Sequence, residues 1–325
     1  MFFSVGPENE GTRLDVFVAD KVPALSRRAV REAIAEGKIR LNGRRARKGL
    51  RVRQGEVVAV ARELAQAQEL GPNPALPVRV LFEDEFIVAV DKPAGIPSHA
   101  LRPFETETVA NFLIARYPEM RSLSRAGLEA GLVHRLDTDT SGVLLAARTA
   151  HVREQLRQQF RTGQVCKEYL ALVLGAVAEP GAISEPLEHD PARPGRMRVA
   201  RGGNGREAMT HYWPLERYTE YTLLRVTIYT GVLHQIRVHL AWAGHPIAGD
   251  ADYGGTEIPL ALKRQFLHAK RISLHHPVSG APFSVESPLP DELAGVLQEL
   301  RGYERQLYRA MHPRPSRRKQ RNSIR

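Results

Sequence analysis

From residue 78 onward, the chain mixes strand patterns and helix patterns in no regular order. The strand patterns alternate apolar and polar residues more than strands of a fully buried parallel sheet do. They cover residues 86–95, 142–147, 167–175, 221–230 and 270–276, and helix patterns cover residues 108–117, 150–161 and 234–243. The sequence contains no internal repeat. It therefore predicts an α+β fold, with a mainly antiparallel mixed sheet flanked by helices.

A smaller α/β unit is predicted ahead of this body, over residues 12–62. Ser26 can cap a helix that Gly37 ends. The apolar face of this helix would hold Ala29, Val30, Ala33 and Ile34. An alternating strand, a turn at Asn42-Gly43 and a closing strand at residues 57–60 follow. The unit resembles the S-four-type domain, a small RNA-binding module first known from a small-subunit ribosomal protein.

The stretch between the two units is typical of a linker, because it is rich in Ala and Gln and then in Pro. We therefore predict the following boundaries: an N-terminal extension at 1–11, the small module at 12–62, a linker at 63–77, the main domain at 78–300, and a helix end with a basic tail at 301–325. A chain of 325 residues is long enough for two such domains.

The net charge of +11 is concentrated at the two ends of the chain. Residues 27–53 hold eleven Lys or Arg against two Glu, and the last fourteen residues hold six basic residues and no acidic one. This distribution predicts a polyanionic partner, although the tail could also be a solvated charge run. We expect structured RNA to contact the small module through Arg27, Arg28, Arg31, Lys38 and Arg40.

Several function classes are excluded by composition. Cys166 is the only cysteine, so the chain can form neither an internal disulfide nor a multi-thiolate zinc site. His234 and His239 are five residues apart and miss the i, i+4 spacing of two metal ligands on a helix, so we expect no metal. The apolar runs are too short to span a bilayer, and the start lacks a signal-like pattern. We expect a cytoplasmic monomer.

The stretch GLVHRLDTDTSGVLLAA, residues 131–147, crowds polar chemistry between apolar runs. Such a cluster costs free energy unless its members find partners. Asp137 and Asp139 could simply bond local backbone amides in a turn, as Asp often does. Two other segments favour a functional interpretation: a His-, Gln- and Arg-bearing helix start within residues 230–255, and a strand that carries Tyr169.

Together these segments resemble the RluA-type pseudouridine synthases. Three motifs carry the resemblance: HRLDTDTSG at 134–142, Lys167-Glu168-Tyr169, and HQIR at 234–237 followed by Gly249-Asp250. Supporting pieces are DKPAG at 91–95, LHA at 267–269 and His276-Pro277. The resemblance spans roughly residues 78–290, in the order of the family. An N-terminal RNA-binding module is a common companion of this domain.

The resemblance implies isomerisation of uridine to pseudouridine in structured RNA, most often large-subunit ribosomal RNA, without a cofactor. Asp137 would be the nucleophile, attacking either the sugar or carbon 6 of uracil. Arg237 would pair with Asp137 and keep it ionised. Tyr169 would lie against the uracil ring, and Arg135 would contact RNA. We interpret His134 as a structural histidine.

At one position the chain departs from the family pattern. The family usually has Thr-Gly-Arg before His-Gln-Ile-Arg, whereas this chain has Thr230-Gly231-Val232-Leu233. The contact that the usual arginine makes is therefore absent at Val232. We expect altered substrate grip rather than loss of activity.

Two alternative functions are retained. Residues 137–140 also fit the D-x-D-x-T signature of aspartyl-phosphate phosphatases, for which Asp250 and Asp252 could supply magnesium ligands. A strongly apolar strand normally precedes that signature, but here His134 and Arg135 interrupt it. The second alternative is a catalytically retired RNA-binding or ribosome-assembly factor. Replacement of Asp137 by Ala separates this factor from an enzyme.

Overall fold

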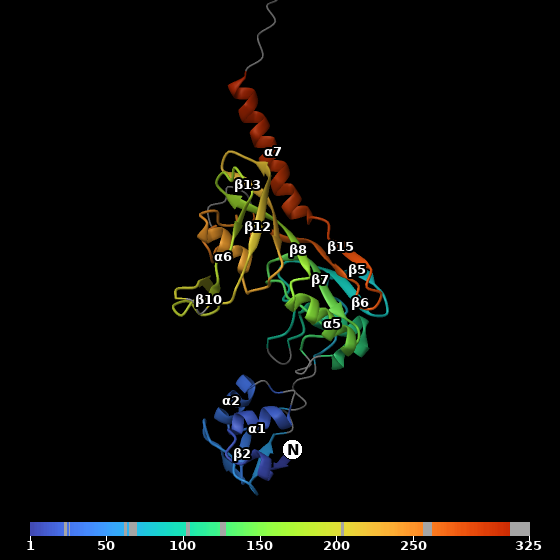
Figure 1. Cartoon of the computed structure of the whole chain (residues 1–325), viewed down its shortest axis with the longest axis vertical. Coiled ribbons are helices and arrows are strands. Elements are labelled where there is room, and N and C mark those ends of the chain that lie inside the picture. The colour runs from blue at the N-terminus through green and yellow to red at the C-terminus, as the bar shows by residue number, and fades with distance from the viewer. Residues whose placement is uncertain are drawn as a thin grey trace, which may run out of the picture. The chain divides into compact units, whose positions relative to one another are not determined.

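A computed structural model describes residues 1–22, 25, 27–61, 64, 70–101, 105–123, 128–202, 205–255 and 262–312 (Figure 1). Contacts divide the chain into two compact units. The first comprises Met1–Val165 and Arg271–Ser287, and the second comprises Cys166–Lys270 and the residues from Pro288 onward. No helix among the described residues is long and apolar enough to cross a membrane.

The small N-terminal module of the first unit is a four-stranded antiparallel sheet with two helices. Its elements are β1 (Phe2–Ser4), η1 (Pro7–Asn9), α1 (Leu14–Lys21), α2 (Arg27–Ala35), β2 (Ile39–Leu41), β3 (Arg44–Arg45) and β4 (Val57–Val60), with strand order β1-β4-β2-β3. The predicted helix and hairpin are confirmed. Asn42 and Gly43 both have positive φ, 48° and 74°, as a tight hairpin turn requires. Gly37 follows α2 with φ of 76°, and Ser26, the predicted cap, lies outside the described residues.

The sequence did not predict β1. Its three residues pair with β4, from Phe2 opposite Ala59 to Ser4 opposite Val57, and Val5 is buried in the core of the module. A three-residue strand is too short to leave a periodic pattern, and it forms because the edge of β4 offers unpaired backbone groups. The first residues of the chain thus complete the sheet of the module.

The remainder of the first unit is built on antiparallel strands covered by helices. Its elements are β5 (Arg79–Glu83), β6 (Ile87–Lys92), α4 (Val109–Arg116), η2 (Pro118–Ser122), β7 (Ser141–Ala147), α5 (Ala150–Arg161), β15 (Pro282–Glu286) and the part of β14 (Leu267–His275) from Arg271 on. β6 pairs with β5 and β7, and β14 pairs with β15. Val152 and Leu156 of α5 pack into the core of these strands. The strands predicted at 86–95 and 142–147 and the helices at 108–117 and 150–161 are confirmed.

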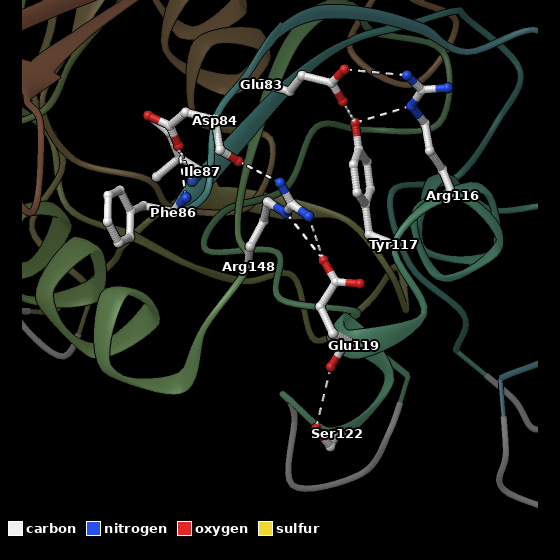
Figure 2. A network of polar contacts seen from close by, with 9 residues as sticks. All are labelled: Glu83, Asp84, Phe86, Ile87, Arg116, Tyr117, Glu119, Ser122 and Arg148. Atoms are coloured by element: carbon white, nitrogen blue, oxygen red, sulfur yellow. Dashed lines mark hydrogen bonds and ion pairs between the residues drawn. The ribbon is translucent and has the colours of Figure 1, made fainter.

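A polar network fixes the β5–β6 turn in this unit (Figure 2). Tyr117, after α4, donates to Glu83 at the end of β5, and this bond lowers the pKa of Glu83. Arg148, after β7, donates to Glu119 at 2.7 Å and to the carbonyl of Asp84 at 2.5 Å. The turn is therefore held from both α4 and β7. This anchors the start of β6, whose other end is Lys92.

Residues 63 and 65–69 of the predicted linker lie outside the described residues, and its later part packs on α4. The amide of Asn73 donates to the carbonyl of Asn111 at 3.1 Å, and the side chain of Asn111 donates to the carbonyl of Gly71 at 2.6 Å. Leu70 is buried. Residues 70–75 are therefore held by hydrogen bonds and packing, rather than extended freely as their proline content suggested.

In its described residues, the second unit is an antiparallel sheet with a separate hairpin and two helices. Its elements are β8 (Cys166–Leu174), β9 (Gly181–Ile183), β10 (Leu187–His189), β11 (Met197–Val199), β12 (Thr210–Arg217), β13 (Tyr221–Ile228), α6 (Gln235–Trp242), the start of β14, and α7 (Asp291–Met311). β13 lies between β8 and β12, β9 pairs with β12, and β10 pairs with β11. The ladders described within each unit are antiparallel, which confirms the predicted α+β class. The strands predicted at 167–175, 221–230 and 270–276 and the helix at 234–243 are also confirmed.

Candidate active site

The HRLDTDTSG motif forms the loop that enters β7, a strand whose residues are all buried. Asp137 is half-buried in this loop and lies between buried Leu136 and buried Thr140. The amide of Thr140 donates to the carbonyl of Asp137 at 3.1 Å, which closes a tight turn. Gly142 has φ of 117°, in a region that side chains disfavour, so a glycine is needed where the loop enters β7.

A buried ammonium group holds the residue after Asp137. Lys92, at the end of β6, has no exposed surface. Its Nζ donates to the carbonyls of Pro93 at 3.0 Å, Ile96 at 2.6 Å and Thr138 at 2.7 Å. The amide of Gly95 donates to the same Thr138 carbonyl at 3.0 Å. The DKPAG segment therefore fixes the backbone of the loop directly after the predicted nucleophile.

A buried serine holds the residue before Asp137. The Oγ of Ser98 accepts from the amide of Leu136 at 2.9 Å and donates to the carbonyl of Leu136 at 2.8 Å. Both main-chain groups of Leu136 are thus satisfied by one side chain. With Lys92 on Thr138, the loop is fixed on either side of Asp137, which restricts where its carboxylate can point.

Sequence reasoning named the DKPAG segment but assigned no role to Lys92, and it overlooked Ser98. A signal for Lys92 was present, since in a strand a lysine two residues after Val90 shares the face of this buried valine and needs several acceptors. Ser98 left no comparable signal. A serine close to proline and glycine is ordinary in a loop, and only the fold brings it to Leu136.

His134 and Arg135 differ in their surroundings. His134 Nε2 accepts from the amide of Leu145 on β7 at 2.9 Å, and its ring stacks on Phe160 at 5.1 Å, so its predicted structural role is supported. Arg135 is exposed. Burial, with a further contribution from the charge of Arg135, lowers the pKa of His99. Arg135 is therefore accessible to a polyanion, as its predicted RNA contact requires.

Tyr169 lies on β8 in the second unit, paired in register with Val226 of β13 and only 6% exposed. Lys167 is buried on the same face of the strand, two residues earlier. Its Nζ donates to the carbonyl of Thr230 at 2.6 Å, and burial lowers its pKa to about 8. The KEY motif therefore places an aromatic ring and a poorly solvated amine side by side.

Arg237 is buried on α6 and held by two carboxylates. Its Nε and Nη2 donate to the two oxygens of Asp250 at 2.7 and 2.8 Å, and Nη2 also donates to Asp252 at 3.0 Å. Its guanidinium lies over the ring of Tyr253, 5.0 Å from the centroid. The Gly249-Asp250 segment of the motif thus serves to orient Arg237. The predicted pairing of Arg237 with Asp137 concerns residues of different units and stays a prediction.

Val232, where the family usually has arginine, is buried in an apolar cluster with Leu187, Met197, Ala208 and Val238. Gln235 fixes the loop around it. The Oε1 of Gln235 accepts from the hydroxyl of Thr230 at 2.9 Å and from the amide of Val232 at 3.1 Å. The departure from the family pattern therefore replaces a cationic side chain by one that packs against the β10–β11 hairpin.

The five predicted RNA-binding residues of the small module are exposed: Arg27, Arg28, Arg31, Lys38 and Arg40. The acidic partners of Arg28 and Lys38 on this surface compete only weakly with a phosphate group for these two side chains. Arg28 pairs with Glu32 at 3.0 Å although its side chain is 81% exposed, and Lys38 pairs with Glu36 at 2.6 Å. Exposed pairs of this kind contribute at most about 1 kcal/mol. The surface is therefore available to a polyanion.

The phosphatase alternative loses its proposed magnesium ligands. Asp250 is bonded at both oxygens by Arg237, and Asp252 is bonded by Arg237 and Arg196. Among the described residues, no group of three or more His, Cys, Asp or Glu side chains could hold a metal ion. Carboxylates that already compensate two guanidinium groups are poor ligands for a divalent cation.

Comparisons with known proteins point to one family. The model of the RNA pseudouridylate synthase family matches residues 86–242, and that of the S4 domain matches residues 12–58. The ribosomal large subunit pseudouridine synthase D of Nitrosomonas europaea is 37% identical over 303 residues, 91% of this chain and 86% of that protein. An uncharacterized RNA pseudouridine synthase of Chloroflexus aurantiacus is 40% identical over 305 residues, 91% of this chain and 92% of that protein.

A solved structure agrees with these matches. Human RNA pseudouridylate synthase domain containing 4 superposes with a TM-score of 0.55 at 26% identity, covering 69% of this chain and 93% of the human chain. A second human structure, RNA pseudouridylate synthase domain containing 1, gives a TM-score of 0.53 at 24% identity and covers 71% of this chain and 98% of its own. The second likeness concerns the fold alone.

Proposed function

Because the chain belongs to the RNA pseudouridylate synthase family, we propose that it isomerises uridines to pseudouridine in large-subunit ribosomal RNA, with Asp137 as nucleophile. The observation that carries the assignment of Asp137 is the double clamp on its loop. Lys92 holds the carbonyl of Thr138 and Ser98 holds both main-chain groups of Leu136. A nucleophile needs such a fixed approach to the reacting carbon.

The reaction requires no atom that the substrate and the protein do not supply. The bond between nitrogen 1 of uracil and the sugar breaks, the base turns, and a bond between carbon 5 and the same sugar carbon forms. The proton on carbon 5 leaves, and nitrogen 1 gains one, so no electron acceptor is involved. A carboxylate can open the glycosidic bond and hold the intermediate while the base turns.

The proposed roles of the other residues follow from their surroundings. Arg237 would be the cation that keeps Asp137 ionised, since a nearby guanidinium favours the charged carboxylate. Tyr169 would pack against the flipped uracil ring, with Arg135 contacting the RNA backbone. The exposed arginines Arg27, Arg28 and Arg31 of the small module would bind phosphates of structured RNA.

Two similarities support ribosomal RNA as the substrate class: the names of two relatives and the match to the S4 domain. Relatives from Nitrosomonas europaea and Escherichia coli carry the name ribosomal large subunit pseudouridine synthase D, and the latter is 32% identical over 308 residues, 90% of this chain and 92% of its own. The S4 domain match adds a module suited to RNA. We further propose that the protein acts as a monomer in the cytoplasm, where ribosomal RNA is available. Light scattering with and without RNA would test the monomer.

The test is pseudouridine mapping of ribosomal RNA by carbodiimide labelling and primer extension. It compares cells that carry the intact gene, a deletion, or the Asp137→Ala variant. We expect the same sites to lose pseudouridine in the deletion and in the variant, at equal protein levels. If the variant still forms pseudouridine at those sites, Asp137 is not the nucleophile. If the deletion changes no site in any RNA pool, the proposed substrate class is wrong.

A further inference from the structure

Arg196 and Met197 join the β10–β11 hairpin of the second unit to the surroundings of Arg237 by polar contacts. Arg196, directly before β11, donates from Nη1 to the carbonyl of Asp252 at 2.8 Å and pairs through Nη2 with its carboxylate at 2.7 Å. The amide of Met197 donates to the hydroxyl of Tyr253 at 2.9 Å. Asp252 and Tyr253 both contact Arg237.

Arg196 supplies a second cation to the carboxylates beside Arg237. Arg237 faces two carboxylates, those of Asp250 and Asp252. Without a second cation, the three groups would carry a net negative charge. Burial raises the pKa of Asp252, but the hydrogen bond from Arg237 and the charge of Arg196 outweigh it, so its pKa lies below the usual value. Arg196 therefore offsets the second carboxylate, since the two arginines and the two aspartates together carry no net charge.

Apolar packing holds Arg196 in this position. Leu187 of β10 and Met197 of β11 are buried against Val232, the residue that departs from the family pattern. At the base of the hairpin tip, the amide of Arg196 donates to the carbonyl of Arg193 at 3.1 Å, and the amide of Asp190 donates to the carbonyl of Arg196 at 3.0 Å. Both main-chain polar groups of Arg196 are thus hydrogen-bonded, and the fixed backbone keeps the side chain within reach of Asp252.

We propose that Arg196 is a positioning residue for catalysis, which acts through Asp252. It orients Arg237 and offsets the charge of Asp252, so that the positive charge of Arg237 stays available to the reacting carboxylate. This inference rests on the proposed function, because it assumes that Arg237 serves the reaction. Through Arg196, the hairpin labelled β10 in Figure 1 is then joined to the residues that hold Arg237. RNA that contacts its exposed tip, residues 191–195, would act on an element joined to Arg237.

The first experiment measures turnover of a uridine-containing ribosomal RNA fragment by Arg196→Gln. We expect kcat to fall between about tenfold and hundredfold while KM changes less than about threefold, because the contact orients a group rather than binding RNA. Arg196→Lys should recover part of the loss, since lysine reaches the carboxylate but cannot also bond the carbonyl. An unchanged kcat for Arg196→Gln overturns the proposal.

The matched control is Arg198→Gln in the same hairpin. Arg198 pairs with Glu188 at 2.7 Å, and its side chain is 33% exposed against 30% for Arg196, but its partner lies within the hairpin and not beside Arg237. We expect Arg198→Gln to keep the wild-type kcat. Equal losses in the two variants, carried by KM, would make the hairpin an RNA contact and overturn the positioning role.

A double variant tests whether the effect passes through Asp252. If Arg196 compensates that carboxylate, Arg196→Gln combined with Asp252→Asn should turn over no more slowly than Asp252→Asn alone. Additive losses would mean that Arg196 acts elsewhere, which contradicts the proposal. The cycle also guards against misfolding, because a hairpin that had collapsed in Arg196→Gln would not be restored by a second substitution.

A spectroscopic measurement separates this proposal from the proposed function. The Nε–H resonance of Arg237 in 15N-labelled protein, assigned by its loss in Arg237→Lys, reports on the Asp250 pair without any substrate. We expect it to broaden in Arg196→Gln and to stay sharp in Arg198→Gln. If wild-type protein forms no pseudouridine, the proposed function fails while this signal still tests the coupling. An unaltered resonance in Arg196→Gln overturns the coupling whatever the activity.

Discussion

The residues proposed for catalysis are held by different physical means in the two units. Around Asp137, the contacts go to main-chain groups: Lys92 donates to the carbonyl of Thr138, and Ser98 bonds Leu136. Around Arg237, the contacts go to the carboxylates of Asp250 and Asp252. The loop therefore depends on filling backbone acceptors in a buried site, whereas the orientation of Arg237 depends on a balance of side-chain charges. A charge balance can be altered from a neighbouring hairpin, and a backbone clamp cannot.

The largest effect is expected from breaking the charge-balanced region. Arg237→Ala would leave the carboxylate of Asp250, whose side chain has no exposed surface, without its cation. We expect kcat to fall by about a thousandfold with KM changed less than about threefold, and stability to fall by about 3 kcal/mol. Single-turnover kinetics with saturating RNA, together with urea unfolding, measure both quantities.

The control for this prediction is Arg237→Lys, which keeps the positive charge but cannot bond both oxygens of Asp250. It should retain more stability than Arg237→Ala while remaining slow. If Arg237→Ala raised KM as much as it lowered kcat, Arg237 would be a binding contact for RNA. The charge balance around Arg237 would then serve RNA binding and not catalysis.

The next largest effect should come from the backbone clamp. Lys92→Met removes the donor to three carbonyls, those of Pro93, Ile96 and Thr138, in a fully buried site. We expect stability to fall by about 3 kcal/mol, since buried acceptors lose their partner, and kcat to fall about a hundredfold through misplacement of Asp137. Unfolding by urea and turnover at a temperature where the variant is folded would measure these changes.

Ser98→Ala provides a graded version of the same test. It releases both main-chain groups of Leu136 but leaves Lys92 in place, so we expect about 1–2 kcal/mol of lost stability and a loss in kcat of about tenfold. Folded Lys92→Met or Ser98→Ala with wild-type kcat would show that the clamp serves stability alone. The loop around Asp137 would then not require outside support.

The two regions also differ in what their sequences reveal. The HRLDTDTSG motif is contiguous, and the strand of apolar residues after it has a clear pattern, so its position before β7 could be predicted. The partners of Arg237 could not be assigned, because Asp250 and Asp252 lie thirteen and fifteen residues further along, after α6 and a turn. A side-chain pair across such a distance follows from the fold and leaves no periodic signal.

The same reasoning applies to elements that the sequence did not predict. The helix α5 and the strand β8 were predicted nearly to their bounds, whereas α7 was predicted only as a helix end at 301–325 and β12 was not predicted. The three-residue strands β1, β9, β10 and β11 were not, because each exists through pairing with a partner strand rather than through its own pattern. Arg196 escaped notice for this reason, since its importance depends on the β10–β11 pairing.

The smallest effect on turnover is expected from the small N-terminal module, to which our proposal assigns RNA binding and no catalytic residue. Arg27, Arg28 and Arg31 are exposed residues of α2, whose Val30, Ala33 and Ile34 are buried. Replacing all three arginines with Ala should leave kcat at saturating RNA within about twofold of wild type. It should weaken RNA binding and flatten its salt dependence, because each phosphate contact adds roughly 0.7 to 0.9 to the slope of log K against log salt.

Filter binding across a range of salt concentrations measures this slope, and Arg157→Ala with Arg161→Ala on α5 removes exposed arginines outside the module as a control. An unchanged slope in the triple variant would show that α2 does not bind phosphates. A large fall in kcat of the triple variant would contradict the expected wild-type turnover. It would mean that the module helps to present the uridine, so that catalysis depends on a third region besides the backbone clamp and the charge balance.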